Sequence, residues 1–119
     1  MTLQACYAAL EGDYNDVLNR LRSERLVQRF VLKFLTDGSY DLLCQSMQTG
    51  NTEEAFRAAH TIKGMCQNLS FTRLATSSEQ ITEKLRHGDM AGAEGLLPMV
   101  KEDYLRTAQA IRTYQEGLE

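Results

Sequence analysis

Apolar residues recur at three- and four-residue spacing along most of the chain, which is the pattern of amphipathic helices. The clearest run follows Ser23, a residue suited to cap a helix, and continues through Phe30 and Phe34 until Asp37-Gly38 interrupts it. The alternating pattern of a half-buried strand does not compete with this interpretation. The sequence therefore predicts a helix after Ser23, and further helices over residues 3–11, 14–22, 39–48, 52–69, 72–86 and 90–118.

Residues that break helices are scarce and fall mostly between these segments. Short turns that contain glycine separate the long helices and so favour antiparallel neighbours. Pro98, the single proline, lies inside the last segment, where its missing amide donor and its clash with the preceding turn are expected to bend or restart the helix. We expect an all-α fold: an antiparallel four-helix bundle with short accessory helices at the N-terminus, built by residues 1–119 as a single domain.

The composition and the net charge of the chain disfavour some classes of binding partner. The chain has 119 residues, of which 43% are hydrophobic and 24% charged, and these values are typical of one soluble globular domain. The net charge of −3 disfavours binding to nucleic acid or to an anionic membrane surface. No apolar run approaches the roughly 20 residues that span a bilayer. We therefore expect a cytoplasmic protein that binds neither nucleic acid nor membrane.

The pattern of the three cysteines predicts neither a metal site nor a disulfide framework. Cys6, Cys44 and Cys66 are odd in number and show neither a CxxC pair nor a histidine at ligand spacing. We expect them to be small, reduced core residues, and we expect no metal site in this chain.

The helix predicted over residues 52–69 carries the candidate chemistry. With an advance of about 100° per residue, His60 lies opposite a continuous apolar stripe and therefore points to solvent. That stripe consists of Ala55, Ala58, Ile62, Met65, Cys66 and Leu69. The neighbours of His60 on the exposed face are Phe56, Arg57, Lys63, Gly64 and Gln67.

A lone surface histidine is usually only solvated, but these neighbours favour a function. Gly64 costs about 1 kcal/mol relative to alanine inside a helix, and it removes side-chain bulk one turn from the imidazole. Lys63 supplies a flexible cation beside it. A solvated imidazole is largely neutral at cytoplasmic pH and can act as a nucleophile without a dedicated base. The pattern indicates a phosphoryl acceptor at His60, with Lys63 as the counter-charge.

The segment His60-Thr61-Ile62-Lys63-Gly64 resembles the HTLKG signature of histidine-containing phosphotransfer (HPt) domains. The flanking Ala58-Ala59 and Asn68-Leu69 fit the same family, and the similarity extends over nearly the whole chain, including the turns at Gly50-Asn51 and His87-Gly88-Asp89.

The resemblance implies a phosphocarrier without catalytic turnover of its own. His60 would accept a phosphoryl group from the aspartate of one receiver domain and pass it to another, with Lys63 as electrostatic helper and Gly64 keeping the approach open. The implied partners are response-regulator receiver domains and a hybrid sensor histidine kinase. No cofactor is implied in this chain, since the magnesium ion belongs to the receiver.

Three positions depart from the family pattern. Ser70 stands where a glycine is common, Met65 stands where a small residue often follows the motif glycine, and Thr82 replaces a Glu or Gln that relatives often place near the imidazole. Because a hydroxyl can donate or accept a hydrogen bond, Thr82 is assigned a supporting role at the imidazole.

The exposed face also predicts a docking surface. Phe56, Arg57 and Gln67 on the histidine helix, with Phe71 past its end, are the expected contacts to a receiver, although an adjacent helix could instead cover Phe56. His87 lies in a turn that ends a helix and is expected to be an ordinary surface residue. Neither sustained heptads nor a second apolar face predicts a dimer, so we expect a monomer.

Two other classes of function stay open. The chain could be the phosphoacceptor domain of a larger histidine kinase, whose ATP-binding domain is absent from these 119 residues. It could also be a helical adaptor that binds a receiver without accepting phosphate. Phosphorylation of His60 distinguishes a phosphocarrier from an adaptor. The sequence does not specify the receivers, the direction of phosphoryl transfer or the output of the pathway.

Overall fold

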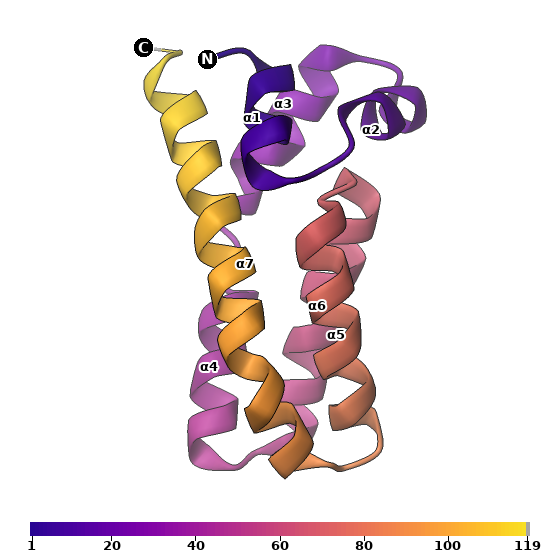
Figure 1. Ribbon diagram of the computed structural model, residues 1–119, viewed down its shortest axis with the longest axis vertical. Coiled ribbons are helices and arrows are strands. Elements are labelled where there is room, and N and C mark those ends of the chain that lie inside the picture. The colour runs from indigo at the N-terminus through magenta and orange to yellow at the C-terminus, as the bar shows by residue number, and fades with distance from the viewer. Residues whose placement is uncertain (119) are drawn as a thin grey trace.

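The computed structural model describes residues 1–118, within which it contains helices and no strand (Figure 1). The helices are α1 (Leu3–Leu10), α2 (Tyr14–Leu21), α3 (Glu24–Phe34), α4 (Ser39–Thr49), α5 (Thr52–Leu69), α6 (Thr72–Arg86) and α7 (Met90–Glu116). All seven predicted helices are present, with ends within about two residues of those expected. The prediction of an all-α fold is confirmed.

Helices α4 to α7 form the bundle, and α1 to α3 gather at one end of it (Figure 1). The main packing partners are α4 with α5, α5 with α6, and α6 with α7. Helix α7 has 27 residues and therefore spans about 40 Å, the longest dimension of the molecule. It passes from the bundle to the accessory end, where α1 packs against it. The predicted four-helix bundle with accessory helices is confirmed.

Polar side chains fix where several helices begin. The carboxylate of Asp13 accepts a hydrogen bond from the Asp16 amide at 3.0 Å, and the Ser23 hydroxyl accepts one from the Leu26 amide at 3.3 Å. Asn51 caps α5 in the same way, through the Glu54 amide at 3.1 Å. The predicted caps at Asp13 and Ser23 are therefore confirmed, and Asn51 fixes the start of the helix that carries His60.

Helix α7 continues through Pro98, so of the predicted bend or restart, the restart is wrong. Proline removes the amide that would bond to the carbonyl four residues earlier, at Glu94. Both Pro98 and Glu94 are exposed, so water can satisfy that carbonyl. Buried residues of α7 before and after Pro98, Ala93 and Val100, belong to the core and keep the helix continuous.

The junction between the bundle and the accessory helices positions the C-terminal end of α5. Gly12, in the turn between α1 and α2, has no room for a side chain, because a Cβ atom there would lie 2.7 Å from the Ser70 carbonyl oxygen. The Asp13 amide donates to that same oxygen at 2.9 Å, and the Tyr7 hydroxyl donates to the Leu69 carbonyl at 2.8 Å. The last turn of α5 is thus held by backbone groups and side chains from the start of the chain.

The cysteines are free thiols. Cys6 and Cys66 are fully buried, as expected, whereas Cys44 is half-buried. Burial raises the pKa of the Cys6 thiol to about 11, and it also raises the pKa of the Cys66 thiol. Among residues 1–118, no three metal-ligating side chains come together, and no helix is long and apolar enough to cross a membrane.

Candidate functional site

Helix α5 presents His60 to solvent. His60 is exposed, whereas Ala58, Ala59 and Ile62 on either side of it in the sequence are at most 2% exposed. The small alanine side chains let α5 pack closely between α4 and α6, its two main neighbours. The orientation predicted from the helical wheel is confirmed.

Gly64, one turn after His60, has no packing reason to be a glycine. A Cβ atom placed there would meet nothing within 4 Å. Glycine in the middle of a helix costs about 1 kcal/mol relative to alanine, and nothing inside the described chain compensates for that cost. The effect of Gly64 is to leave open surface beside the imidazole, where a second molecule could approach closely.

The two cations on α5 near His60 differ in their surroundings. Arg57 pairs with Glu54 at 2.5 Å, and its side chain is 62% exposed. Lys63 is half-buried and forms no ion pair with any residue from 1 to 118. Lys63 is therefore the α5 cation whose charge is available to an anion bound at His60.

An aromatic stack flanks the imidazole. The ring of Phe56, one turn before His60, lies 5.7 Å from the imidazole between centroids, with 18° between the two planes. The guanidinium carbon of Arg86, at the end of α6, lies 5.0 Å from the centroid of the same ring. Phe56 is half-buried, so the neighbouring helix covers part of it and leaves part accessible.

Arg86 is a residue that sequence reasoning missed. Arg86 lies in the last turn of α6, and only the packing of α6 against α5 brings it into contact with Phe56. Its Nε donates to the Glu83 carboxylate at 3.0 Å, which fixes the guanidinium. A basic residue in the last turn of a helix is common, so its position alone gave no signal.

Thr82 does not support the imidazole. It is fully buried, and its hydroxyl donates to the Ser78 carbonyl oxygen at 2.6 Å. A hydroxyl inside a helix commonly bonds back to the carbonyl four residues earlier, and this bond uses its only proton. The expectation of a hydrogen bond from Thr82 to His60 is therefore wrong, because the side chain is committed to the core of α6.

Phe71 does not lie on a docking surface. It is 0% exposed and packs edge-on against Phe34, with ring centroids 5.2 Å apart, and against Tyr7. Ser70 adopts a left-handed conformation, with φ of 57°, and turns the chain inward directly after α5. The predicted exposure of Phe71 is therefore wrong, since it is a central core residue.

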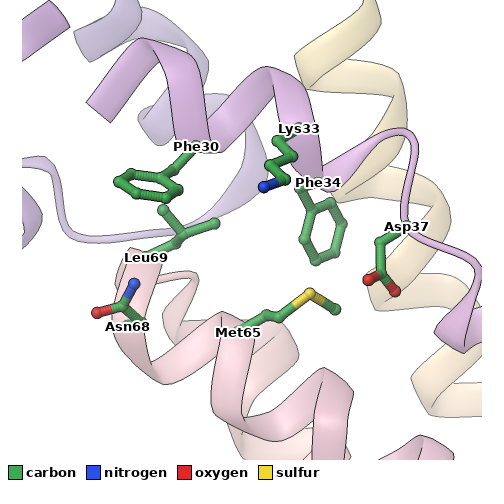
Figure 2. A pocket seen from close by; sticks show the side chains of 7 residues that line it. All are labelled: Phe30, Lys33, Phe34, Asp37, Met65, Asn68 and Leu69. Carbon is green, nitrogen blue, oxygen red and sulfur yellow. The ribbon is translucent and has the colours of Figure 1, made fainter. Parts of the chain in front are cut away.

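The exposed aromatic residue near this end of α5 is Phe30, which is 36% exposed rather than fully inside its apolar stripe. It borders a hollow of about 270 Å³ between α3 and the second half of α5 (Figure 2). The hollow is lined by Phe30, Lys33, Phe34, Asp37, Met65, Asn68 and Leu69. Asn68 lies two turns after His60, with Gly64 between them, so the hollow adjoins the histidine face.

Ser70, where the family pattern has glycine, is held by side chains of α2. Its hydroxyl donates to the Asp16 carboxylate at 2.6 Å and accepts from Arg20 at 2.8 Å. Arg20 also donates to the Asn68 carbonyl at 2.9 Å. The hydrogen bonds from Ser70 and Arg20 lower the pKa of Asp16. These contacts stabilise a left-handed conformation that glycine would adopt without strain.

The comparisons with known proteins agree with this architecture. The family model described as "Hpt domain" matches residues 16–114, which is most of the chain. The chain therefore belongs to the Hpt domain family, whose members carry phosphoryl groups on histidine in two-component phosphorelays and interact with receiver domains. No curated protein and no solved structure gives a significant match.

Proposed function

We propose that His60 is the phosphorylated residue of this Hpt domain, accepting a phosphoryl group from the aspartate of one receiver domain and passing it to the aspartate of another. The observation that carries the proposal is the exposed imidazole beside the open surface at Gly64. The chain has two histidines, and the other, His87, is an exposed residue next to Glu83 in the turn after α6.

The transfer needs only a neutral imidazole from this chain. The lone pair of a ring nitrogen of His60 forms a bond to phosphorus while the bond from phosphorus to the aspartate oxygen breaks. The aspartate leaves as a carboxylate, and the proton on the other ring nitrogen passes to water. In the second transfer, the other ring nitrogen regains a proton from water, the carboxylate of another receiver forms a bond to phosphorus, and the phosphorus–nitrogen bond breaks so that neutral imidazole leaves.

Charge stabilisation is divided between the two proteins in this proposal. Lys63, unpaired among the described residues, offsets part of the negative charge that arrives at His60. The magnesium ion and the acidic pocket belong to the receiver, and no cofactor is assigned to this chain. The donor in this scheme is the receiver domain of a hybrid sensor histidine kinase, and the acceptor is a response regulator.

The docking surface surrounds His60 on α5. Phe56, Arg57 and Gln67 are all at least partly accessible there. We extend this surface along α5 to the hollow beside Phe30, in place of the buried Phe71, because Gly64 leaves no side chain between the two. A receiver seated over His60 would bury the apolar lining of that hollow.

The test is phosphoryl transfer from a labelled phospho-receiver, using several receivers, to the wild type, His60→Gln and the control His87→Gln. The proposal predicts acid-labile label on the wild type and on His87→Gln, and none on His60→Gln. Label that persists on His60→Gln would assign the phosphate elsewhere. A folded wild type that binds a receiver but is labelled by no receiver or kinase would instead be an adaptor.

A further inference from the structure

We infer that Phe56 is a positioning residue for His60: its ring, held from the α6 side by Arg86, orients the imidazole for phosphoryl transfer. This inference rests on the proposed role of His60 and assigns Phe56 an action beyond contact with a receiver. It also brings Arg86 into the site.

The geometry supports an orienting contact. Phe56 and His60 are four residues apart on α5, so their side chains are neighbours along the helix surface. Their rings lie 5.7 Å apart with 18° between planes, which is an offset stack of the kind that aromatic pairs favour. An exposed side chain without such a contact changes rotamer within nanoseconds. The stack restricts the directions in which the ring nitrogens of His60 can point.

No hydrogen bond performs this task among residues 1–118. Thr82 is buried and donates to Ser78, and the Thr61 hydroxyl, next to His60, donates to the Arg57 carbonyl at 2.9 Å. The aromatic face of Phe56 is therefore the contact that orients the imidazole within the described chain.

Arg86 holds the aromatic ring in place. Its guanidinium carbon lies 5.0 Å from the Phe56 centroid, within the range of a cation–π interaction. Glu83 in turn holds Arg86 through a hydrogen bond at 3.0 Å. The end of α6 is thereby coupled through Phe56 to the imidazole on α5.

Orientation matters because the attacking nitrogen must meet phosphorus in line with the leaving oxygen. A positioning residue affects the rate within the complex of the two proteins, whereas a docking residue affects how much complex forms. The two roles of Phe56 are therefore separable by experiment.

The first measurement needs no phosphate. Ring currents from Phe56 should shift the NMR resonances of the His60 imidazole away from those of His87, with the two residues assigned using His60→Gln and His87→Gln. Phe56→Leu keeps an apolar side chain but removes the ring, and it should move the His60 resonances toward those of a solvated imidazole. Phe56→Tyr should retain the shift. His60 resonances that are the same in the wild type and in Phe56→Leu would overturn the inference.

Arg86 is tested by the same spectra. Arg86→Ala should reduce the ring-current shift at His60, while Lys84→Ala should leave it unchanged. Lys84 is a matched control because it is an exposed cation in the same last turn of α6 and pairs with Asp89 rather than contacting Phe56. An unchanged shift in Arg86→Ala would remove Arg86 from the site.

The second measurement is the rate of transfer as a function of receiver concentration. Phe56→Leu should lower the maximal rate by about two- to tenfold, whatever its effect on the half-saturating concentration through docking, and Phe56→Tyr should restore the maximal rate. A raised half-saturating concentration with an unchanged maximal rate would show docking alone and contradict the inference. If the wild type accepts no phosphoryl group, the proposed function fails, yet the NMR result still decides whether Phe56 orients His60.

Discussion

At the scale of single residues, the site combines the reactive imidazole of His60 with a glycine, Gly64, that leaves the neighbouring surface open. Residue spacing on one helix was enough to predict that His60, Lys63 and Gly64 share an exposed face, because those positions depend only on the helical period. Arg86 could not be found in this way, because its contact with Phe56 depends on the packing of two helices. Thr82 was expected beside the imidazole, because the sequence does not show which hydroxyls donate to a carbonyl oxygen of their own helix.

The open surface at Gly64 leads to a prediction in which stability and activity change in opposite directions. Gly64→Ala should stabilise the fold by about 0.5–1 kcal/mol, because a Cβ atom there meets nothing within 4 Å. The same methyl group should slow transfer from a receiver. The matched control is Gly95→Ala in α7, which is equally unobstructed and should stabilise without affecting transfer. Thermal unfolding and transfer rates test both effects, and faster or unchanged transfer in Gly64→Ala would be evidence against a close approach at this position.

At the scale of elements, the turn between α1 and α2 is a support for the end of α5. Gly12 directly follows the helix predicted over residues 3–11, and the structure shows that the Ser70 carbonyl oxygen, the Leu10 side chain and the Tyr7 ring occupy the space around it. Such a contact joins segments far apart in the chain and leaves no periodic signal. The same reason explains why Phe71 was expected outside: local pattern does not show that Ser70 turns the chain into the core.

Gly12→Ala should therefore destabilise the protein by about 1–3 kcal/mol, because the added Cβ atom would lie within 3 Å of three neighbouring atoms, one of them backbone. Gly38→Ala is the control, since a Cβ atom at Gly38 meets nothing within 4 Å. Urea denaturation of both variants measures the difference. Equal stability of Gly12→Ala and the wild type would mean that the neighbouring atoms shift at little energetic cost to make room for the Cβ atom.

At the scale of the whole molecule, an ionic cluster around the buried Asp103 joins the end of α1 to α6 and α7. Asp103 is 1% exposed, and its carboxylate accepts a hydrogen bond from Arg106 at 2.8 Å and lies 3.6 Å from Arg73 of α6. Arg106 also pairs with Glu11, at the end of α1, at 3.2 Å. The hydrogen bond that Arg106 donates to the Asp103 carboxylate raises the pKa of Arg106, which keeps the guanidinium charged.

Removal of Arg106 should be costly, because it leaves a buried carboxylate with a weaker partner. We expect Arg106→Ala to lower the free energy of unfolding by about 2–4 kcal/mol. Arg112→Ala, at an exposed position of the same helix, should change it by less than about 0.5 kcal/mol. Urea denaturation of the two variants is the measurement, and similar effects would show that the cluster adds little to stability.

The overall architecture was the most predictable level, because each helix carries its own periodic pattern and caps. The tertiary contacts at Gly12, Ser70 and Asp103 became visible only in the structure.

The measurement that tests the central claim most directly is phosphorus NMR of the protein after incubation with a phosphorylated receiver. The account predicts a phosphohistidine resonance on the wild type and on His87→Gln that is absent from His60→Gln. A phosphohistidine resonance that survives in His60→Gln, or none on a folded wild type that binds the receiver, would contradict it.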